Sequence, residues 1–238
     1  MLKKLFKLKN NKSADYTGIV TNYNIHETSN INFGEKTLID NAVIEDYVNL
    51  SFFQGHASNI TIGRCTYAGP IQLYGYNGDL DIGRYCSIAG RLVLICGNGF
   101  HRPDRISNYP FPFKDPFSDL GLDNSMYEDI SKFPKSKLVI GNDVWIGEDV
   151  VITKNVKVGN GVVIGSKSVV TNDIPSYAIV GGNPATVRKF RHDEEEIRML
   201  EKIKWWEWRL SAIIDEIEIF SLTGESLKKK LLVLLDQI

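Results

Sequence analysis

Residues Lys137–Val170 read KLVIGNDVWIGEDVVITKNVKVGNGVVIGSKSVV, with a large aliphatic side chain at every sixth position. These positions are Ile140, Ile146, Ile152, Val158, Ile164 and Val170. A second series of valines follows the first four positions at a distance of four residues: Val144, Val150, Val156 and Val162. An amphipathic helix and an ordinary strand have other periods, so neither explains the pattern. An interval of six is typical of hexapeptide β-helices, in which each unit is a short strand and a turn.

Three such units close one triangular coil, so about 18 residues form one turn of the solenoid. The aliphatic side chain of each unit is expected to point inward and to stack on its equivalent in the next coil, about 4.8 Å along the axis. A single coil cannot bury this row, so neighbouring coils must cover it. Accidental spacing of valine-rich and isoleucine-rich strands is the alternative, and six consecutive matches argue against it.

The same interval occurs upstream, at Leu38, Ile44, Leu50 and Ile62, and again at Ile82, Ile88 and Leu94. His56 occupies one position where an aliphatic residue is expected, which predicts a distorted coil or a turn excursion, with a histidine that faces solvent or is satisfied by hydrogen bonds. The step from 62 to 82 exceeds a multiple of six by two residues, which predicts a small bulge or an extended corner between 69 and 78. We therefore expect an N-terminal arm or cap over 1–30 and a β-helix over 31–188.

A long insertion, 97–137, interrupts the repeat, and its five prolines exclude regular structure. Ordered loops of this length in compact domains are usually functional. Its aromatic residues, which include Phe100, Tyr109, Phe111, Phe113, Phe117 and Tyr127, carry enough apolar surface to fold against another part of the structure. We expect this loop to form the wall of a pocket.

The last segment, 189–238, is expected to be helical and to follow an all-β body. Asp193 and Glu196 have the spacing of a capping box at the start of a helix running through residue 220. Leu200, Ile203, Trp206 and Leu210 form one apolar stripe, which must pack on the end coil or on a neighbouring subunit. Residues 225–237 are expected to form a last short helix.

Composition excludes several classes of protein. The formal net charge of −1 argues against a nucleic-acid surface. Three cysteines favour a reducing, cytoplasmic location, with Cys65 and Cys86 as small buried side chains. No run is long enough to span a membrane. The basic N-terminal arm is interpreted as a solvated terminus, with contact to anionic lipid as the weaker alternative.

Four segments in order give the chain a wider resemblance: DIGRYCSIAGRLVLICGNGFHRPDRISNYPF, VIGNDVWIGEDVVI, IPSYAIVGGNPATVRKF and EEEIRMLEKIKWWEW. Together they resemble the hexapeptide xenobiotic acetyltransferases, which include chloramphenicol and streptogramin O-acetyltransferases and saccharide-modifying relatives. The resemblance covers about 82 to 208. It implies a left-handed parallel β-helix, a homotrimer with active sites between subunits, and acetyl-CoA as the acyl donor, with no metal.

The resemblance also implies the reaction. We expect an O-acetyltransferase that acts on the hydroxyl of a small molecule, most plausibly a sugar or polysaccharide unit, because repeat units begin earlier here than in antibiotic-modifying members. Antibiotic O-acetylation and N-acetylation of a nucleotide-linked amino sugar stay open as alternatives. A non-catalytic trimeric scaffold is the alternative from another class. A zinc carbonic anhydrase would need three converging histidines, and the spacing of His26, His56 and His101 does not fit.

Site residues follow from the same motifs. His101 matches the loop histidine of the family, and imidazole, with an ordinary pKa of about 6.5, suits a general base. Trp145 is expected on the substrate side, and Tyr109 and Phe111 as the acceptor wall. Coenzyme A needs close backbone approach and cations for its phosphates. The candidates for these roles are Gly147, Gly165, Ser166, Lys167, Thr171, Arg188 and Lys189. Asn172 stands where the family commonly has a lysine.

Overall fold

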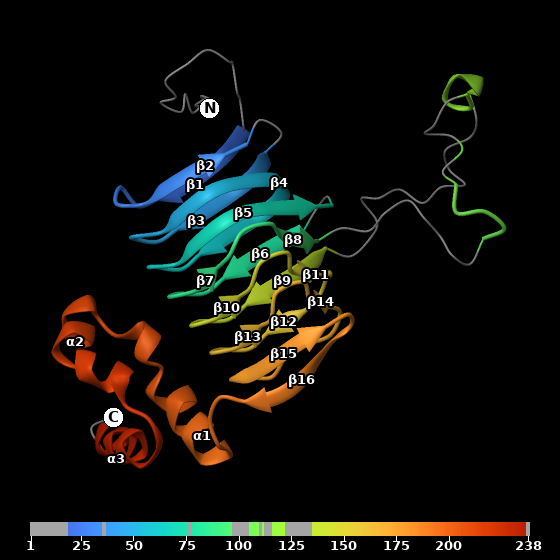
Figure 1. Ribbon diagram of the computed structural model, residues 1–238. Coiled ribbons are helices and arrows are strands. Elements are labelled where there is room, and N and C mark those ends of the chain that lie inside the picture. Colours follow the sequence, from blue (N-terminus) through green and yellow to red (C-terminus); the bar gives the residue numbers. More distant parts are fainter. Residues whose placement is uncertain are drawn as a thin grey trace.

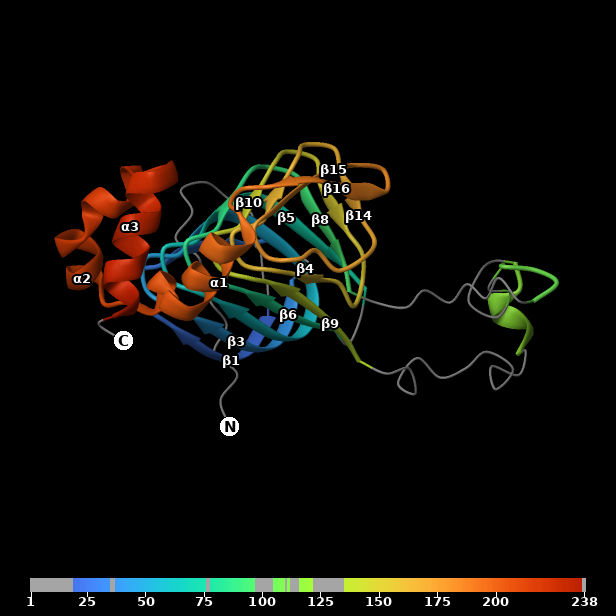
Figure 2. The ribbon, with the colours of Figure 1, turned by 90° about the horizontal axis from the view of Figure 1, so that it is seen from below.

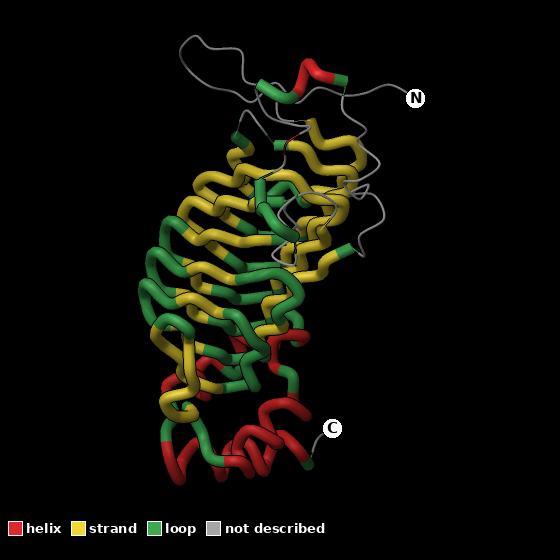
Figure 3. The backbone as a smooth tube through the Cα atoms, turned by 90° about the vertical axis from the view of Figure 1, so that its right-hand side faces the viewer, coloured by secondary structure: helices red, strands yellow, loops and turns green. Residues whose placement is uncertain are grey.

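The computed structural model describes residues 19–34, 37–75, 78–96, 105–109, 111, 116–121 and 135–236. Its body is a parallel β-helix whose coils stack along one axis, followed by a helical C-terminal region (Figures 1 and 3). Strand pairing joins equivalent segments of successive coils and so defines three faces, which we name A, B and C.

Face A contains β1 (Ile19–Ile25), β3 (Leu38–Ile44), the end of β4 (Asn49–Ile62), β6 (Gly78–Ile82), β9 (Ser136–Ile140) and β12 (Lys157–Val158). Face B contains β2 (Asn30–Phe33), the start of β4, the start of β5 (Tyr67–Tyr74), β7 (Ser87–Ile88), β10 (Trp145–Ile146), β13 (Val163–Ile164) and β15 (Ala178–Gly182). Face C contains the middle of β4, the end of β5, β8 (Leu92–Ile95), β11 (Val151–Ile152) and β14 (Val169–Val170). We name the edges AB, BC and CA after the faces that meet there.

The six-residue repeat is confirmed. Every aliphatic residue of both series between 140 and 170 is buried in the core. Ile140, Ile146 and Ile152 lie on faces A, B and C in turn, and Val158 returns to face A. Because each coil leaves its inward row half covered, coil stacking buries the whole series.

The AB edge repeats one strained conformation from coil to coil. Five residues there have a positive φ, a backbone conformation that residues other than glycine rarely adopt. They are Tyr47, Cys65, Tyr85, Asp143 and Tyr177. The backbone N–H of each of these residues donates to the preceding coil: that of Tyr47 to Thr28 Oγ1, and the others to a backbone carbonyl, such as Tyr85 N to Arg64 O at 2.9 Å. The interpretation of Cys65 as a buried side chain was therefore wrong, because it occupies an exposed corner and is partly exposed, whereas Cys86 is fully buried.

The N-terminal coils differ from expectation in two respects. The solenoid begins at Ile19, inside the stretch expected to be an arm or cap, because β1 pairs with β3 as the first rung of face A. Leu38 is exposed and Ile39 takes the inward position, since the alternation of β3 shifts by one residue. His56 is partly exposed within the continuous strand β4, as expected. The longer coil between 62 and 82 turns after Tyr74, which ends β5, and Gly75 there has a φ of 111°.

The C-terminal region is a broken helix, and the expected single helix to residue 220 was wrong. Its elements are α1 (Glu194–Ile203), the 3₁₀ turn η5 (Trp205–Glu207), α2 (Leu210–Asp215), η6 (Ile217–Ser221) and α3 (Gly224–Leu235). The capping box at Asp193 is present. Helix α1 stops because Lys204 adopts a left-handed conformation. Trp206, just after this break, is buried. Leu200 and Ile203 of α1 form a second core with α3 and with Tyr177 of the last coil.

Candidate functional site

The inserted loop leaves the solenoid after β8 and returns at β9, so both of its ends lie at the CA edge. Cys96 donates its backbone N–H to Tyr74 O at 2.8 Å, and β9 begins at Ser136, which pairs with Gly78. A side chain on Gly78 would place Cβ 2.7 Å from Cys96 Cβ and 2.9 Å from Ser136 Oγ. The three chain segments therefore pack so closely that only glycine fits between the two ends of the loop.

His101 lies outside the described residues. The described part of the loop contains Tyr109, Phe111 and the 3₁₀ turn η2 (Ser118–Leu120). The rings of Tyr109, Phe111 and Phe117 contact one another edge to face, with centroids 4.9 to 6.3 Å apart. Figures 1 and 2 both show this segment standing away from the solenoid. The aromatic cluster therefore covers no face of its own coil stack.

Trp145 lies on face B, at the outward position of β10, and 59% of its surface is exposed. Its neighbours in register are Ser87 in the preceding coil and Val163 in the following coil. Tyr67 precedes Ser87 in the same row and is also exposed. An indole ring held on a flat sheet with small neighbours offers an apolar platform to a ligand or to another subunit.

Four of the expected coenzyme A residues gather at the BC edge. A side chain on Gly147 would place Cβ 2.6 Å from the backbone N of Ser166, so coil stacking alone requires glycine there. At Gly165 the atom nearest to such a Cβ is Val180 O at 3.5 Å, an ordinary contact, so stacking of the coils does not require glycine there. Ser166 is exposed, and its Oγ accepts the N–H of Glu148 at 3.1 Å. Lys167 is exposed at the same corner, with a φ of 61°.

The other three coenzyme A candidates lie elsewhere. Thr171 follows β14 and is exposed towards the CA edge. Arg188 and Lys189 are exposed on β16 (Ala185–Phe190), which pairs antiparallel with β15 at the end of face B. Arg188 donates to Gly181 O at 3.1 Å. The set is therefore divided between the BC edge, the CA edge and the last strand.

The triangular section separates Trp145 from the loop of its own chain. Trp145 is on face B, whereas the loop is rooted at the CA edge, which is the vertex opposite face B. The described part of the loop, which includes η2, stands away from the solenoid (Figure 2). One chain alone therefore does not bring Tyr109 and Phe111 to Trp145.

A small hollow beside the loop ends was missed by the sequence analysis. Its volume is about 230 Å³, and it is lined by Gln54, His56, Gln72 and Tyr74 together with Gly55, Leu73 and Gly75. Gln54 and Gln72 are in register on neighbouring coils. Tyr74 pairs with Ile95, directly before the loop begins. The polar His56 in an aliphatic position was the one sequence signal for this hollow.

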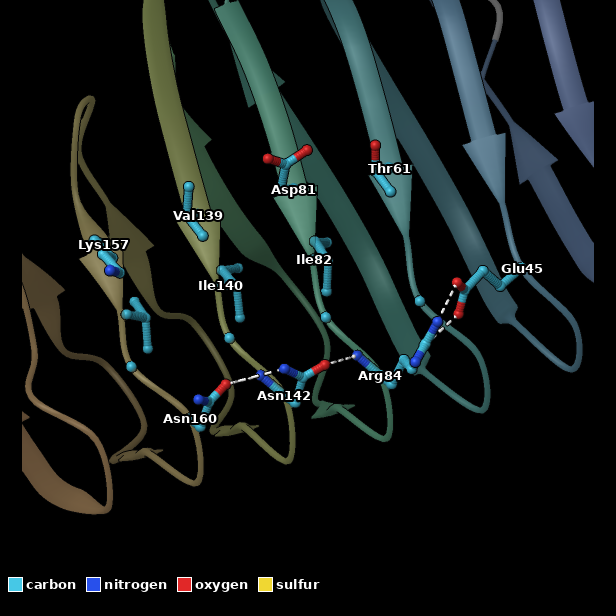
Figure 4. A pocket seen from close by; sticks show the side chains of 15 residues that line it. Glu45, Thr61, Asp81, Ile82, Arg84, Val139, Ile140, Asn142, Lys157 and Asn160 are labelled. Atoms are coloured by element: carbon cyan, nitrogen blue, oxygen red, sulfur yellow. Dashed lines mark hydrogen bonds and ion pairs between the residues drawn. The ribbon is translucent and has the colours of Figure 1, made fainter. Parts of the chain in front are cut away.

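A longer groove of about 350 Å³ runs along the AB edge (Figure 4). Its polar residues are held by one another: the Arg84 guanidinium donates to both oxygens of Glu45 at 2.7 Å, and Asn142 Nδ2 donates to Asn160 Oδ1 at 3.0 Å. The Arg84 hydrogen bonds lower the pKa of Glu45 below its ordinary value, against the opposing effect of partial burial. Asn160 in turn donates to Glu201 of α1, so this row ties the helices to the solenoid.

Among the residues that the structure describes, no three His, Cys, Asp or Glu side chains converge as a metal site would require. No helix in the part of the chain that the structure describes is long and apolar enough to cross a bilayer.

Residues 137–172 match the family model for the bacterial transferase hexapeptide (six repeats). The chain is 39% identical to a chloramphenicol acetyltransferase of Klebsiella aerogenes, over 65% of this chain and 79% of that protein. It is 38% identical to a probable macrolide acetyltransferase of Lysinibacillus sphaericus, over 64% and 82%. It is 32% identical to the galactoside O-acetyltransferase of Escherichia coli (strain K12), over 67% and 66%.

Among solved structures, the chain is similar to a hexapeptide-repeat acetyltransferase of Vibrio cholerae O1 biovar eltor in complex with acetyl-coenzyme A. That similarity has a TM-score of 0.45 and 25% identity, over 60% of this chain and 67% of the other. The repeat and the β-helix define a hexapeptide transferase. The chain belongs to the hexapeptide-repeat xenobiotic acetyltransferase family and is an acyltransferase. The alternative of a non-catalytic scaffold was therefore wrong.

Proposed function

We propose that this protein transfers the acetyl group of acetyl-coenzyme A to a hydroxyl group of a small molecule, and that the acceptor is a sugar or polysaccharide unit. The observation that carries the proposal is the loop between β8 and β9, which stands in the place expected from the family and bears His101. The two ends of the loop pack side by side against Gly78. A loop that holds a catalytic side chain in position needs such fixed ends.

His101 acts as the general base in this proposal. It accepts the proton of the acceptor hydroxyl while the oxygen attacks the thioester carbonyl, so that a C–O bond forms. The C–S bond then breaks, and the proton passes from His101 to the departing thiolate. A placed general base contributes about 10²–10⁴ in rate.

We infer that the active site is built from two copies of the chain in a homotrimer. The described loop segment with Tyr109 and Phe111 stands away from its own solenoid. Trp145 is exposed on face B, which does not include the CA edge. A neighbouring copy can supply face B to that loop, which would bury both apolar surfaces. Cyclic symmetry repeats the same contact three times and closes the ring.

Coenzyme A fits the surface between such copies. Gly165, without a side chain, and the exposed Ser166 and Lys167 would let the pantetheine chain approach the backbone at the BC edge. Thr171 at the CA edge would approach the cofactor from the side of the loop. Arg188 and Lys189, exposed on β16, supply the cations that the phosphates need.

A sugar is the preferred acceptor because of the hollow next to the loop ends. Gln54 and Gln72 each offer an amide donor and acceptor, which suit neighbouring hydroxyl groups. The exposed ring of Tyr74 offers a flat apolar surface at the same place. The similarity to a galactoside O-acetyltransferase, at 32% identity, supports the choice.

Chloramphenicol or a macrolide is the second candidate acceptor. The relatives with these names are more similar in sequence than the galactoside enzyme. Against them stands the N-terminal part of the chain: about a third of the chain lies outside the chloramphenicol acetyltransferase match, and the solenoid already begins at Ile19.

The test is a panel of acceptors with release of the free coenzyme A thiol as the readout: chloramphenicol, a macrolide, methyl hexosides, disaccharides and amino sugars. We expect the fastest release with a saccharide, and His101→Ala should reduce that rate at least about 10²-fold. His26→Ala is the matched control, because this exposed histidine contacts Thr28 far from the loop. Full activity of His101→Ala would overturn the mechanism, and a preference for chloramphenicol would overturn the choice of acceptor.

A further inference from the structure

The helical region carries a surface that combines exposed apolar and acidic side chains. Ile214, Ile217 and Phe220 are exposed to 68%, 58% and 45%, although α2 and η6 belong to a region with its own core. Asp215 and Glu218 are exposed beside them. We name these five residues the acidic apolar patch. Three large apolar side chains exposed close together in the sequence, on α2 and the adjacent η6, point to an interaction site.

The charges of the patch are available to a partner. In the described part of the chain, Asp215 and Glu218 form no ion pair, whereas the intervening Glu216 is paired with Lys230 at 2.7 Å. Arg209 is the exposed basic residue at the start of α2. The partner that fits should therefore be apolar and basic.

The patch is continuous with the AB edge of the solenoid through stacked aromatic rings. Phe220 contacts Trp205 with ring centroids 4.9 Å apart, and Trp205 contacts Tyr85 with centroids 5.0 Å apart. Tyr85 occupies the fourth coil along that edge, three coils from the turn at Thr28. The rings thus connect the patch to the N-terminal half of the solenoid.

We propose that the acidic apolar patch binds the chain's own N-terminal residues 2–9, LKKLFKLK. This segment alternates apolar side chains with four lysines and no acidic residue. Leu2, Leu5 and Phe6 have the i, i+3, i+4 spacing of one helical face, which would meet the apolar side chains of the patch. The lysines would then lie near Asp215 and Glu218.

The connecting segment is long enough. The described chain starts at Ile19, at the CA end of face A, and β1 crosses that face in seven residues. A path back across face A, from the CA edge to the AB edge, covers about 23 Å. The three coils between Thr28 and Tyr85 add about 14 Å along the axis, so the straight-line distance is about 27 Å. Residues 10–18 span up to about 30 Å when extended. They bring residue 10 to the AB edge and leave residues 2–9 to cross the patch.

The test is hydrogen exchange, followed by mass spectrometry, on the full chain and its variants. We expect the peptide covering 210–221 to exchange at least about fivefold faster in Phe6→Asp than in the unmodified chain. Lys12→Asp, within the connecting segment, is the control and should leave this exchange rate unchanged. Equal exchange in Phe6→Asp and the unmodified chain would overturn the proposal.

A charge exchange tests the same contact with a second measurement. Two charge-reversal variants should each remove the protection of residues 210–221 from exchange. One changes Lys3, Lys4 and Lys7 together to Glu, and the other changes Asp215 and Glu218 together to Lys. A variant that combines both sets of changes should recover the protection. Protection of residues 2–9 that occurs only with phosphatidylglycerol vesicles would overturn the proposal in favour of a membrane. So would cross-links from residue 6 to the patch that form only between ¹⁴N-labelled and ¹⁵N-labelled copies.

Discussion

At the scale of single residues, an exposed side chain can contribute to ligand binding without contributing to the stability of the folded chain, and Trp145 is the clearest example. Its ring is largely exposed on face B, so its removal costs the single chain little packing. We predict that Trp145→Ala raises KM at least about tenfold while Tm changes by no more than a few degrees, since a buried aromatic group at an interface contributes a few kcal/mol to binding. Steady-state kinetics and calorimetry on the same sample measure both. Val163→Ala, in the same row, is the control, and an unchanged KM in Trp145→Ala would remove this residue from the site.

The Glu45–Arg84 pair gives a prediction for pH at the same scale. Arg84 lowers the pKa of the Glu45 carboxyl in the folded state, so the carboxylate contributes stability above its unfolded pKa of about 4.3. That contribution is lost as the pH falls through the lower folded pKa. Glu45→Gln should therefore lower Tm at pH 7 and have little effect near pH 2. Thermal unfolding from pH 2 to pH 7 checks this; the same Tm difference at both ends of the range would contradict it.

At the scale of elements, the two ends of the inserted loop form one unit with β6. Gly78→Ala would push Cβ against Cys96 and Ser136, and such overpacking costs about 1–3 kcal/mol. We predict a larger loss of kcat than Trp145→Ala causes, because the loop that bears His101 would be displaced. Gly90→Ala is the control, since its nearest neighbour to an added Cβ is Pro70 Cδ at 3.5 Å. Equal kcat in the two glycine variants would show that the loop ends do not position the base.

The helical region yields a prediction of the same kind. Asp193 accepts the N–H of Glu196 at 2.8 Å and so caps α1, which carries Leu200 and Ile203 into the second core. Loss of such a cap costs about 1 kcal/mol. Asp193→Ala should lower stability to urea by that amount and leave kcat unchanged. Asp193→Asn, which keeps the acceptor, should recover most of the loss.

At the scale of the whole molecule, an experiment can test whether each active site is built from two copies of the chain. His101→Ala and Trp145→Ala chains, mixed under conditions that exchange subunits, should form trimers in which one copy supplies an intact loop and its neighbour an intact Trp145. Random assembly restores roughly a quarter of the sites, because each site needs one suitable copy on each side. Coenzyme A release at low acceptor concentration measures the recovery. Activity equal to the average of the two separate variants would show that each site belongs to one chain.

The sequence by itself determined the β-helix, because a buried side chain at every sixth position is a local property that each coil repeats on its neighbour. It also determined the cap of α1 and the place of the loop insertion. It missed the first coil and the position of Leu38, since β1 and β3 are defined by pairing between distant segments and not by the interval of six. It also missed the break after Ile203, because a left-handed residue at Lys204 is imposed by packing and not by helical spacing.

Only the tertiary structure decided how the candidate site residues are distributed. The motifs place Trp145 and the loop in consecutive segments, yet a triangular coil sends them to a face and to the vertex opposite. The structure also distinguishes two glycines that look equivalent in the sequence. An added Cβ at Gly147 would clash with Ser166 of the neighbouring coil, whereas one at Gly165 would make only ordinary contacts. The physical reason is that face, edge and clearance depend on what the neighbouring coil places a few ångströms away, and each such neighbour is about 18 or more residues distant in the chain.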